Sequence, residues 1–258
     1  MRVQPAQGHR VTGNPAHGEA PLPFAPGESI QYKVHVGGMG TMGDATMSVE
    51  GPVDVRGTST YVLRSRSRAG IGPFKGSQLM ESWLDPLKVR SLRFHEQEHR
   101  FLRSRNVWVE ILPDDRSWSD NHDASGESIT SASLDELSFI YYLRTLPMRK
   151  DTTYEFSSHF DATRDPIRVK ESSGRMVETP SGAVMTTLME MHVHDPRRYQ
   201  GEGVIRVFLS DDRCRLPVRI ESSIPGMGSM VLTMDSYVVP GTSCEPGRVQ
   251  PRRDSTAT

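Results

Sequence analysis

The sequence predicts a mainly β protein: a strongly curved antiparallel sheet or open β-barrel, with one helix packed on the concave side. About a dozen segments alternate apolar and polar residues and are separated by turn signals. One segment, "LDELSFIYYLRTLP" at 134–147, has instead the pattern of a helix that is apolar on nearly every side. Such a short helix must be enclosed by something larger, and a curved sheet is the natural container.

The first half of the chain reads as a series of hairpins. In "ESIQYKVHV", Ile30, Tyr32, Val34 and Val36 share one face and polar residues the other, which is typical of a half-buried strand. The glycine-rich turn "GGMGTMG" then returns the chain, so 28–50 is a predicted hairpin. Further strand patterns follow at the close spacing of an antiparallel meander: "STYVLRSRSR", "SQLMESWLD", "KVRSLRFHEQEHR" and "RNVWVEIL".

The helix is predicted over 134–146. Ser133 is the expected N-cap, Asp135 and Glu136 suit the positive N-terminal end of a helix, and Pro147 ends it. After it the strand pattern resumes in "TTYEFSSHF", "AVMTTLMEMHVH", "GVIRVFLSDD", "RLPVRIES" and "GSMVLTMDSYVV". Strands and helices do not alternate, so the chain does not resemble a nucleotide-binding α/β fold.

The composition makes some classes of partner, such as nucleic acid, less favoured. The 258 residues carry a net charge of -1, which gives no electrostatic drive toward nucleic acid. No run of about 18 apolar residues predicts a transmembrane segment, and no signal peptide is visible in the first residues. Residues 1–25 and 241–258 are rich in Pro, Gly and polar residues and are predicted to be disordered. Cys214 and Cys244 fit either one disulfide or two free thiols.

The chain also resembles the bacterial DUF3108 family, a domain of unknown function. The matching features are "PFAPGESIQYKVHVGGMGTMGDATMSVEG", "FKGSQLMESWLDPLKVRSLRFHEQEHR", "LDELSFIYYLRTLP", "VETPSGAV" and "VFLSDDRCRLPVRIES". The resemblance implies that 26–240 form a single DUF3108-like β domain in the bacterial periplasm or cell envelope. It supplies no catalytic residues and no cofactor.

The metal-ligand and catalytic motifs are weak. In "HVHD", His192 and His194 would share one face of a strand beside Asp195, but no third or fourth ligand stands at a telling spacing, so no metal site is predicted. The adjacent Asp211 and Asp212 point apart when extended and indicate a turn. No catalytic residue and no cofactor motif is predicted.

A concave sheet with a helix across it commonly encloses an apolar ligand. The sequence therefore leads to the hypothesis of a non-enzymatic cell-envelope protein that binds a hydrophobic or amphipathic molecule, such as a lipid or cell-wall component, between sheet and helix. The helix and the two echoing turns, "GMGTM" and "GMGSM", supply the predicted contact residues: Phe139, Tyr142, Leu143, Met39, Met42, Met227 and Met230.

Two alternatives stay open. In the first, the helix fills a dry core, and the protein is a scaffold whose partner is another envelope protein. In the second, the protein is a hydrolase in which carboxylates such as Glu81 and Asp85, on either side of Trp83, meet histidines in one cleft.

Overall fold

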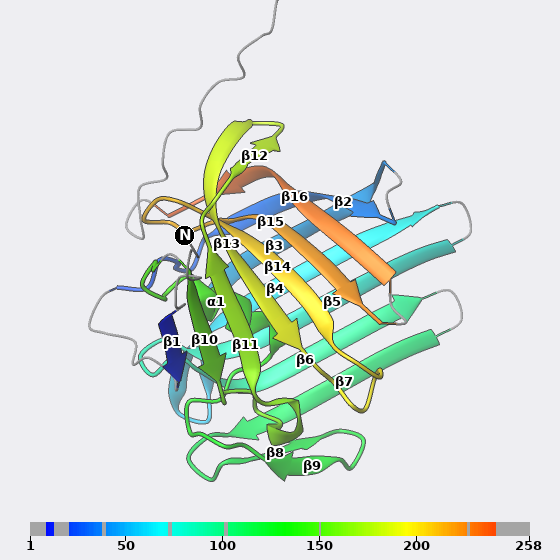
Figure 1. Ribbon diagram of the computed structural model, residues 1–258. Coiled ribbons are helices and arrows are strands. Elements are labelled where there is room, and N and C mark those ends of the chain that lie inside the picture. Colours follow the sequence, from blue (N-terminus) through cyan, green and yellow to red (C-terminus); the bar gives the residue numbers. More distant parts are fainter. Residues whose placement is uncertain are drawn as a thin grey trace, which may run out of the picture.

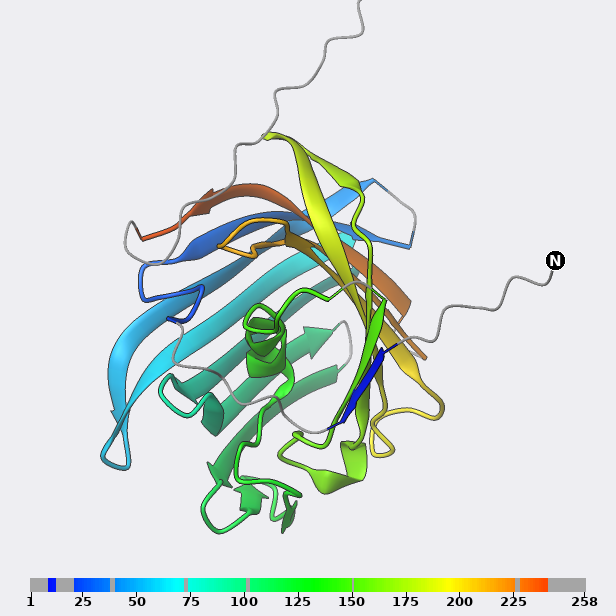
Figure 2. The same cartoon turned by 60° about the vertical axis from the view of Figure 1, so that its left-hand side comes forward.

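The computed structural model describes residues 9–12, 21–37, 40–71, 74–100, 103–149, 151–225 and 228–240. These residues form one large sheet that curves around a single α-helix, α1 (Glu136–Leu143), without closing into a barrel (Figure 1). Figure 2 shows α1 inside the curve of the sheet. The predicted fold class is confirmed.

The strands before α1 include the longest strands of the sheet. The strands before α1 are β1 (His9–Thr12), β2 (Ser29–Val36), β3 (Thr41–Val55), β4 (Thr58–Ile71), β5 (Phe74–Asp85), β6 (Arg90–Arg100), β7 (Arg103–Leu112), β8 (Ser117–Asp120) and β9 (Ser125–Glu127). From β2 to β9 each strand pairs antiparallel with the next, as the meander pattern predicts.

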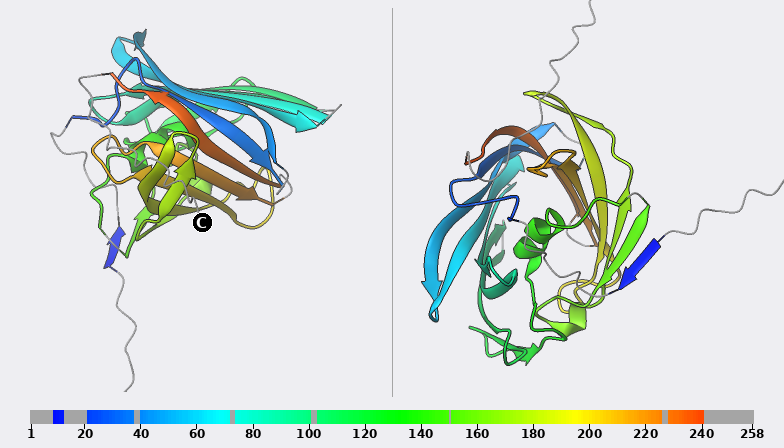
Figure 3. Two further views of the ribbon diagram at one scale, coloured as in Figure 1. Left: turned by 90° about the horizontal axis from the view of Figure 1, so that it is seen from above. Right: turned by 90° about the vertical axis from the view of Figure 1, so that its left-hand side faces the viewer.

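The strands after α1 form the other side of the curve. They are β10 (Thr152–Phe156), β11 (Ile167–Ser172), β12 (Met176–Thr179), β13 (Gly182–Val193), β14 (Gly203–Ser210), β15 (Pro217–Ile224) and β16 (Gly228–Val238), with a 3-10 turn, η1 (Ala162–Arg164), between β10 and β11. The sheet order is β1-β10-β11-β13-β14-β15-β16-β2 and then on to β9, while β12 pairs with β13 alone. The antiparallel pairing of β16 with β2 thus joins the two halves, and Figure 3 shows the result end-on, with strands around α1.

The core lies on the concave side of the sheet because every second side chain of a strand points there. On β2, Ile30, Tyr32 and Val34 are buried, as the alternation predicts. On α1, the buried residues are Leu137, Ser138, Phe139, Tyr141, Tyr142 and Leu143. The predicted helix is therefore enclosed on most sides.

The N-cap of α1 differs from the sequence prediction. Asp135, and not Ser133, occupies it: Asp135 Oδ1 accepts hydrogen bonds from the backbone N–H groups of Leu137 and Ser138, each at 2.9 Å. Ser138 Oγ in turn accepts one from the backbone N–H of Asp135 at 2.9 Å, which completes a capping box. The helix starts later than predicted because Leu134 is extended and forms a bridge with His159.

The other end of α1 is held by a buried ion pair. Arg144 follows the helix and donates to both carboxylate oxygens of Glu28, at 2.6 and 2.8 Å, with both side chains fully buried. The same guanidinium also donates to the carbonyl oxygens of Pro23 and Cys214. One side chain therefore connects the helix to the start of the sheet and to the loop between β14 and β15.

Two parts of the segment 1–25 belong to the described residues, and the predicted disorder of the segment as a whole stays a prediction. His9–Thr12 forms β1, which pairs in parallel with β10, and Phe24 is buried with its ring 5.0 Å from that of Tyr141. The predicted C-terminal tail, 241–258, lies outside the described residues.

Candidate functional site

A cavity of about 490 Å³ lies on the concave side of the sheet, beside α1. Strands β2 to β6 and β14 to β16, the helix, and the loop between β13 and β14 all contribute to its wall. Most of the wall surface is apolar and includes Met47, Met80, Phe94, Ile140, Ile220 and Leu232. Its volume falls within the range of about 300–1,000 Å³ that is common for small-molecule sites.

The helix presents a different face to this cavity than the sequence predicts. Glu136, Leu137 and Ile140 line the cavity. Phe139 and Tyr142 are buried and pack edge-on against Phe156 of β10, with ring centroids 5.5 and 5.6 Å apart. These aromatic side chains fix the helix against β10, and the smaller side chains on its other side leave the space.

Leu143 is fully buried and is not part of the cavity wall. Of the predicted methionines, Met230 lines the cavity, and Met42 lines a separate shallow hollow at the end of β3, β4 and β5. Met39 and Met227 lie outside the described residues.

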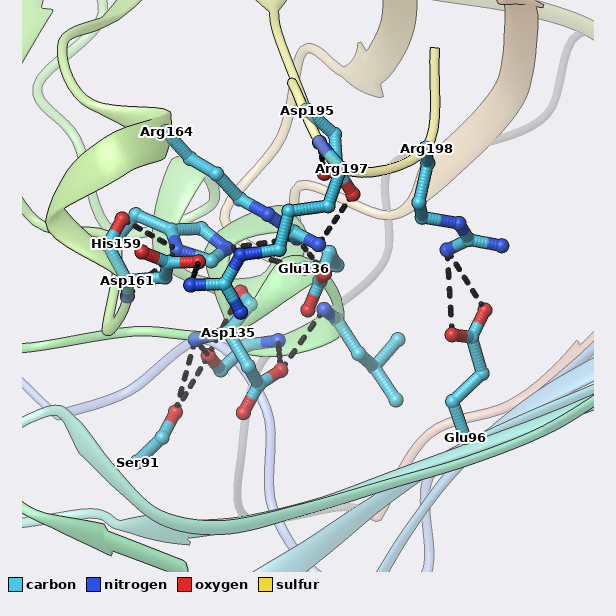
Figure 4. A network of polar contacts seen from close by, with 12 residues as sticks. Ser91, Glu96, Asp135, Glu136, His159, Asp161, Arg164, Asp195, Arg197 and Arg198 are labelled. Atoms are coloured by element: carbon cyan, nitrogen blue, oxygen red, sulfur yellow. Dashed lines mark hydrogen bonds and ion pairs between the residues drawn. The ribbon is translucent and has the colours of Figure 1, made fainter. Parts of the chain in front are cut away.

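Glu136, in the N-terminal turn of α1, brings a charged group to the cavity. Figure 4 shows the polar contacts around it. Glu136 Oε1 pairs with Arg164 Nη1, and Arg164 Nη2 pairs with Asp195, so the guanidinium lies between two carboxylates. His159 Nε2 lies 3.9 Å from Glu136 Oε1. Burial opposes ionisation of Glu136, but Arg164 and His159 outweigh it and hold the pKa of the carboxyl well below its usual value. Glu136 is therefore a fixed negative charge at the helix end of the cavity.

The pKa of Asp135, one residue earlier, is shifted in the opposite direction. Its side chain is fully buried, and this burial raises the pKa of the carboxyl to about 6, although hydrogen bonds from Ser138, Ser82 and Ser91 oppose the shift. Ser82 Oγ on β5 donates to Asp135 Oδ2 at 2.5 Å. Asp135 therefore both caps the helix and fastens its first turn to the sheet.

A second charged cluster lies along β6. Glu96, Glu98 and Arg100 line the cavity, as does Arg198 from the loop between β13 and β14. Arg198 reaches across to both carboxylate oxygens of Glu96, and Figure 4 shows this contact between the two walls. The cavity is thus apolar over most of its wall, with charged side chains on β6, on the loop that carries Arg198, and at Glu136 of the helix.

His192 and Asp195 of "HVHD" contact different partners. His192 Nδ1 lies 3.0 Å from Glu202 and its Nε2 3.3 Å from Glu190, while Asp195 pairs with Arg164. Among the residues that the structure describes, no group of three or more His, Cys, Asp or Glu side chains is arranged to hold a metal ion.

The carboxylates considered for a hydrolase also lie apart from the cavity. Glu81 accepts from His95 Nδ1 at 2.9 Å, but both face the outer side of the sheet, because the alternate residues Phe94 and Glu96 face the cavity. Asp85 accepts backbone hydrogen bonds in the turn between β5 and β6.

The SDD motif forms a turn, as its sequence predicts. Asp212 Oδ1 accepts from the backbone N–H groups of Cys214 and Arg215, at 2.8 and 3.0 Å, between β14 and β15. Cys214 is buried and disulfide-bonded. Its predicted partner, Cys244, lies outside the described residues, so the pairing stays a prediction.

Sequence reasoning missed Glu96, Glu98 and Arg198. A signal for the first two was present: in "RFHEQEHR", Phe94, Glu96 and Glu98 occupy alternate positions, so carboxylates continue the face that an aromatic residue places in the core. Arg198 had no such signal, because only the fold brings its loop opposite β6.

These observations define an open, barrel-like β protein with a half-open cavity on the concave side of its sheet. The chain belongs to the family described as protein of unknown function (DUF3108), whose model matches residues 31–235. Among the described residues, α1 is too short to cross a membrane, and no other helix is long and apolar enough to do so.

Two solved structures match most of the length of the chain. One is a beta-barrel-like protein of the domain of unknown function DUF1849 from Brucella abortus, with a TM-score of 0.54, 11% identity, and coverage of 83% of this chain and 98% of that one. The other is a protein with a YmcC-like fold from Bacteroides fragilis, with a TM-score of 0.30, 11% identity, and coverage of 84% and 98%. Only the first supports the fold. No curated protein matches the chain.

Proposed function

We propose that this protein is a non-enzymatic component of the bacterial cell envelope that binds a hydrophobic or amphipathic molecule, such as a lipid or cell-wall component, in the cavity between the sheet and α1. The observation that carries the proposal is the cavity itself, with its mostly apolar wall and its few charged groups. Apolar surface of this kind gains free energy when a ligand replaces water, and the polar groups orient that ligand.

The cavity favours this proposal over a scaffold with a dry core. A scaffold needs the helix to fill the space inside the sheet, and Phe139 and Tyr142 do so on the side toward β10. On the side of Ile140 the space is not filled. A protein interior otherwise packs closely, so a cavity of this size would reduce the stability of a pure scaffold.

The disulfide at Cys214 supports a location in the envelope. Structural disulfides persist in oxidising compartments such as the periplasm and are rare in the reducing cytosol. This agrees with the exported location that the family resemblance implies.

Binding can be tested with a neutral fluorescent probe, N-phenyl-1-naphthylamine, and a matched pair of variants on β15. Ser222 lines the cavity together with Ile220 and Ile224, whereas Ser223 is exposed on the other face of the strand. We expect Ser222→Phe to fill part of the cavity and to weaken probe binding by about ten-fold or more, and Ser223→Phe to leave it unchanged.

Far-UV circular dichroism and thermal unfolding verify that both variants fold. Native mass spectrometry of the wild-type protein, followed by organic extraction, identifies any molecule that copurifies. Equal probe binding by Ser222→Phe and the wild type would exclude the cavity as the site. A wild-type protein that binds no probe and has only its own mass would overturn the proposal in favour of the scaffold.

A further inference from the structure

The polar end of the cavity is built along β6. Phe94, Glu96, Glu98 and Arg100 occupy alternate positions of this strand and all line the cavity. At about 3.3 Å per residue, the six steps from Phe94 to Arg100 span roughly 20 Å. Ser91, at the start of the same strand, contacts Ser138 of α1 through hydroxyl groups 2.7 Å apart. The wall therefore changes from an aromatic ring on the side of the helix to charged groups farther along β6.

Three guanidinium groups surround the two carboxylates at this end. Glu96 accepts from Gln78 Nε2 at 3.0 Å and lies 3.5 Å from Arg105 Nη1, while Glu98 pairs with Arg100 Nε. Arg198 adds contacts of 3.2 and 3.3 Å to Glu96 and of 3.5 Å to Glu98. These are longer than the 2.7–2.9 Å or so at which hydrogen bonds between charged groups are strongest.

Of the two guanidinium groups that contact Glu96, that of Arg198 belongs to the cavity wall and that of Arg105 does not. Arg198 can therefore turn to an anion in the cavity without leaving a carboxylate unpaired. If it did so, Glu96 would keep Gln78 and Arg105, and Glu98 would keep Arg100. A cationic ligand on Glu96 would instead compete with Arg198 and leave a second positive charge beside it. Bringing unpaired like charges together in a partly buried site costs free energy. The cluster thus favours an anion.

We infer that the cavity binds an amphiphile with one anionic head group, a carboxylate or a phosphate, which Arg198 holds while the apolar tail extends past Phe94 toward Ile140. The guanidinium presents paired N–H donors that match either kind of head group. This inference rests on the proposed function, because it names the class of ligand for the same cavity.

The test compares four molecules with the same twelve-carbon chain: laurate, dodecyl phosphate, methyl laurate and dodecylamine. Each displaces N-phenyl-1-naphthylamine from the wild-type protein and from two variants. Arg198→Gln removes the proposed contact. Arg197→Gln is the matched control, since Arg197 is the adjacent residue, pairs with Asp161 at 3.2 Å and is not part of the cavity wall.

We expect the wild type to bind laurate and dodecyl phosphate about ten-fold more tightly than methyl laurate and dodecylamine. Arg198→Gln should lose this preference and keep its affinity for methyl laurate, while Arg197→Gln behaves like the wild type. Acetate and inorganic phosphate, which have no tail, should not displace the probe at the concentrations at which their amphiphilic counterparts do.

The outcomes distinguish a failure of the anionic ligand class from a failure of binding in the cavity. Equal binding of laurate and methyl laurate, or an equal loss for all four molecules in Arg198→Gln, overturns the anionic class and leaves the cavity as a binding site. Displacement by inorganic phosphate alone shows an anion site that needs no tail and also overturns the inference. If neither the probe nor laurate binds in calorimetry, the proposed function fails as well.

Discussion

Replacing Asp135 by Asn should make the free energy of unfolding less dependent on pH between about 4 and 6. Asp135 caps α1 from a fully buried position, where its pKa rises from 3.8 to about 6. Because the folded protein holds this proton more tightly than the unfolded chain, the free energy of unfolding falls as pH rises through that window.

The pKa difference sets the magnitude. A shift from 3.8 to about 6 corresponds to about 3 kcal/mol between the fully protonated and fully ionised limits. The free energy of unfolding of the wild type therefore rises by about 1 kcal/mol when the pH falls from 7 to 5. Asp165, whose pKa burial also raises to about 6, adds a change of the same sign. Carboxyls with a lowered pKa, such as Glu136, lose their contribution only below their ordinary value of 4.5.

Asn keeps the cap because its side-chain oxygen can accept from Leu137 and Ser138, and its amide can donate to Ser82 Oγ. Urea unfolding at pH 7, 6 and 5 measures the effect. We subtract the free energy of unfolding of the wild type from that of Asp135→Asn. We expect this difference to fall by about 1 kcal/mol from pH 7 to pH 5, because the wild type gains stability and the variant does not. A difference that stays constant over these pH values would refute the assignment. Asp135→Ala, which removes the cap, should be less stable than Asp135→Asn at every pH.

Two further predictions concern the ion pair at the C-terminal end of the helix and the disulfide. Glu28→Gln should lower the free energy of unfolding in urea by about 3–5 kcal/mol, because it leaves the buried Arg144 without its counter-charge. Glu155→Gln, which removes a more exposed pair with Arg168 at 3.6 Å, should lower it by less than about 1 kcal/mol. Equal losses would contradict the role of burial. Cys214→Ser should lower stability by about 2–5 kcal/mol, and a reductant should do the same to the wild type, so an unchanged Tm in both experiments would contradict a stabilising disulfide.

The sheet was predictable because its signals are local. Alternation in β2 identifies its buried face, and glycine-rich turns mark the hairpins. The cap of α1 was not assigned correctly because Ser133 and Asp135 are both good N-cap residues, and only the bridge of Leu134 with His159 decides between them. N-cap propensity alone does not predict a contact with a residue that only the fold brings close.

The cavity wall was less predictable than the fold. Apolar composition does not reveal which face of a nearly all-apolar helix packs and which faces open space. Phe139 was a reasonable ligand contact by size, yet its size is also what lets it fill the gap against Phe156. Contacts between distant segments, such as Arg198 with Glu96, depend on the path of the whole chain and leave no local pattern.

The seam between β16 and β2 has a consequence for assembly. Met230 on β16 pairs with Val36 on β2, and both residues line the cavity. Neither half of the chain can therefore form the site alone, and it exists only when segments far apart in sequence have met, a step that is slow for sheets of this kind. A ligand that binds only the completed sheet would stabilise it by mass action, so folding yield and thermal stability should both rise with ligand concentration.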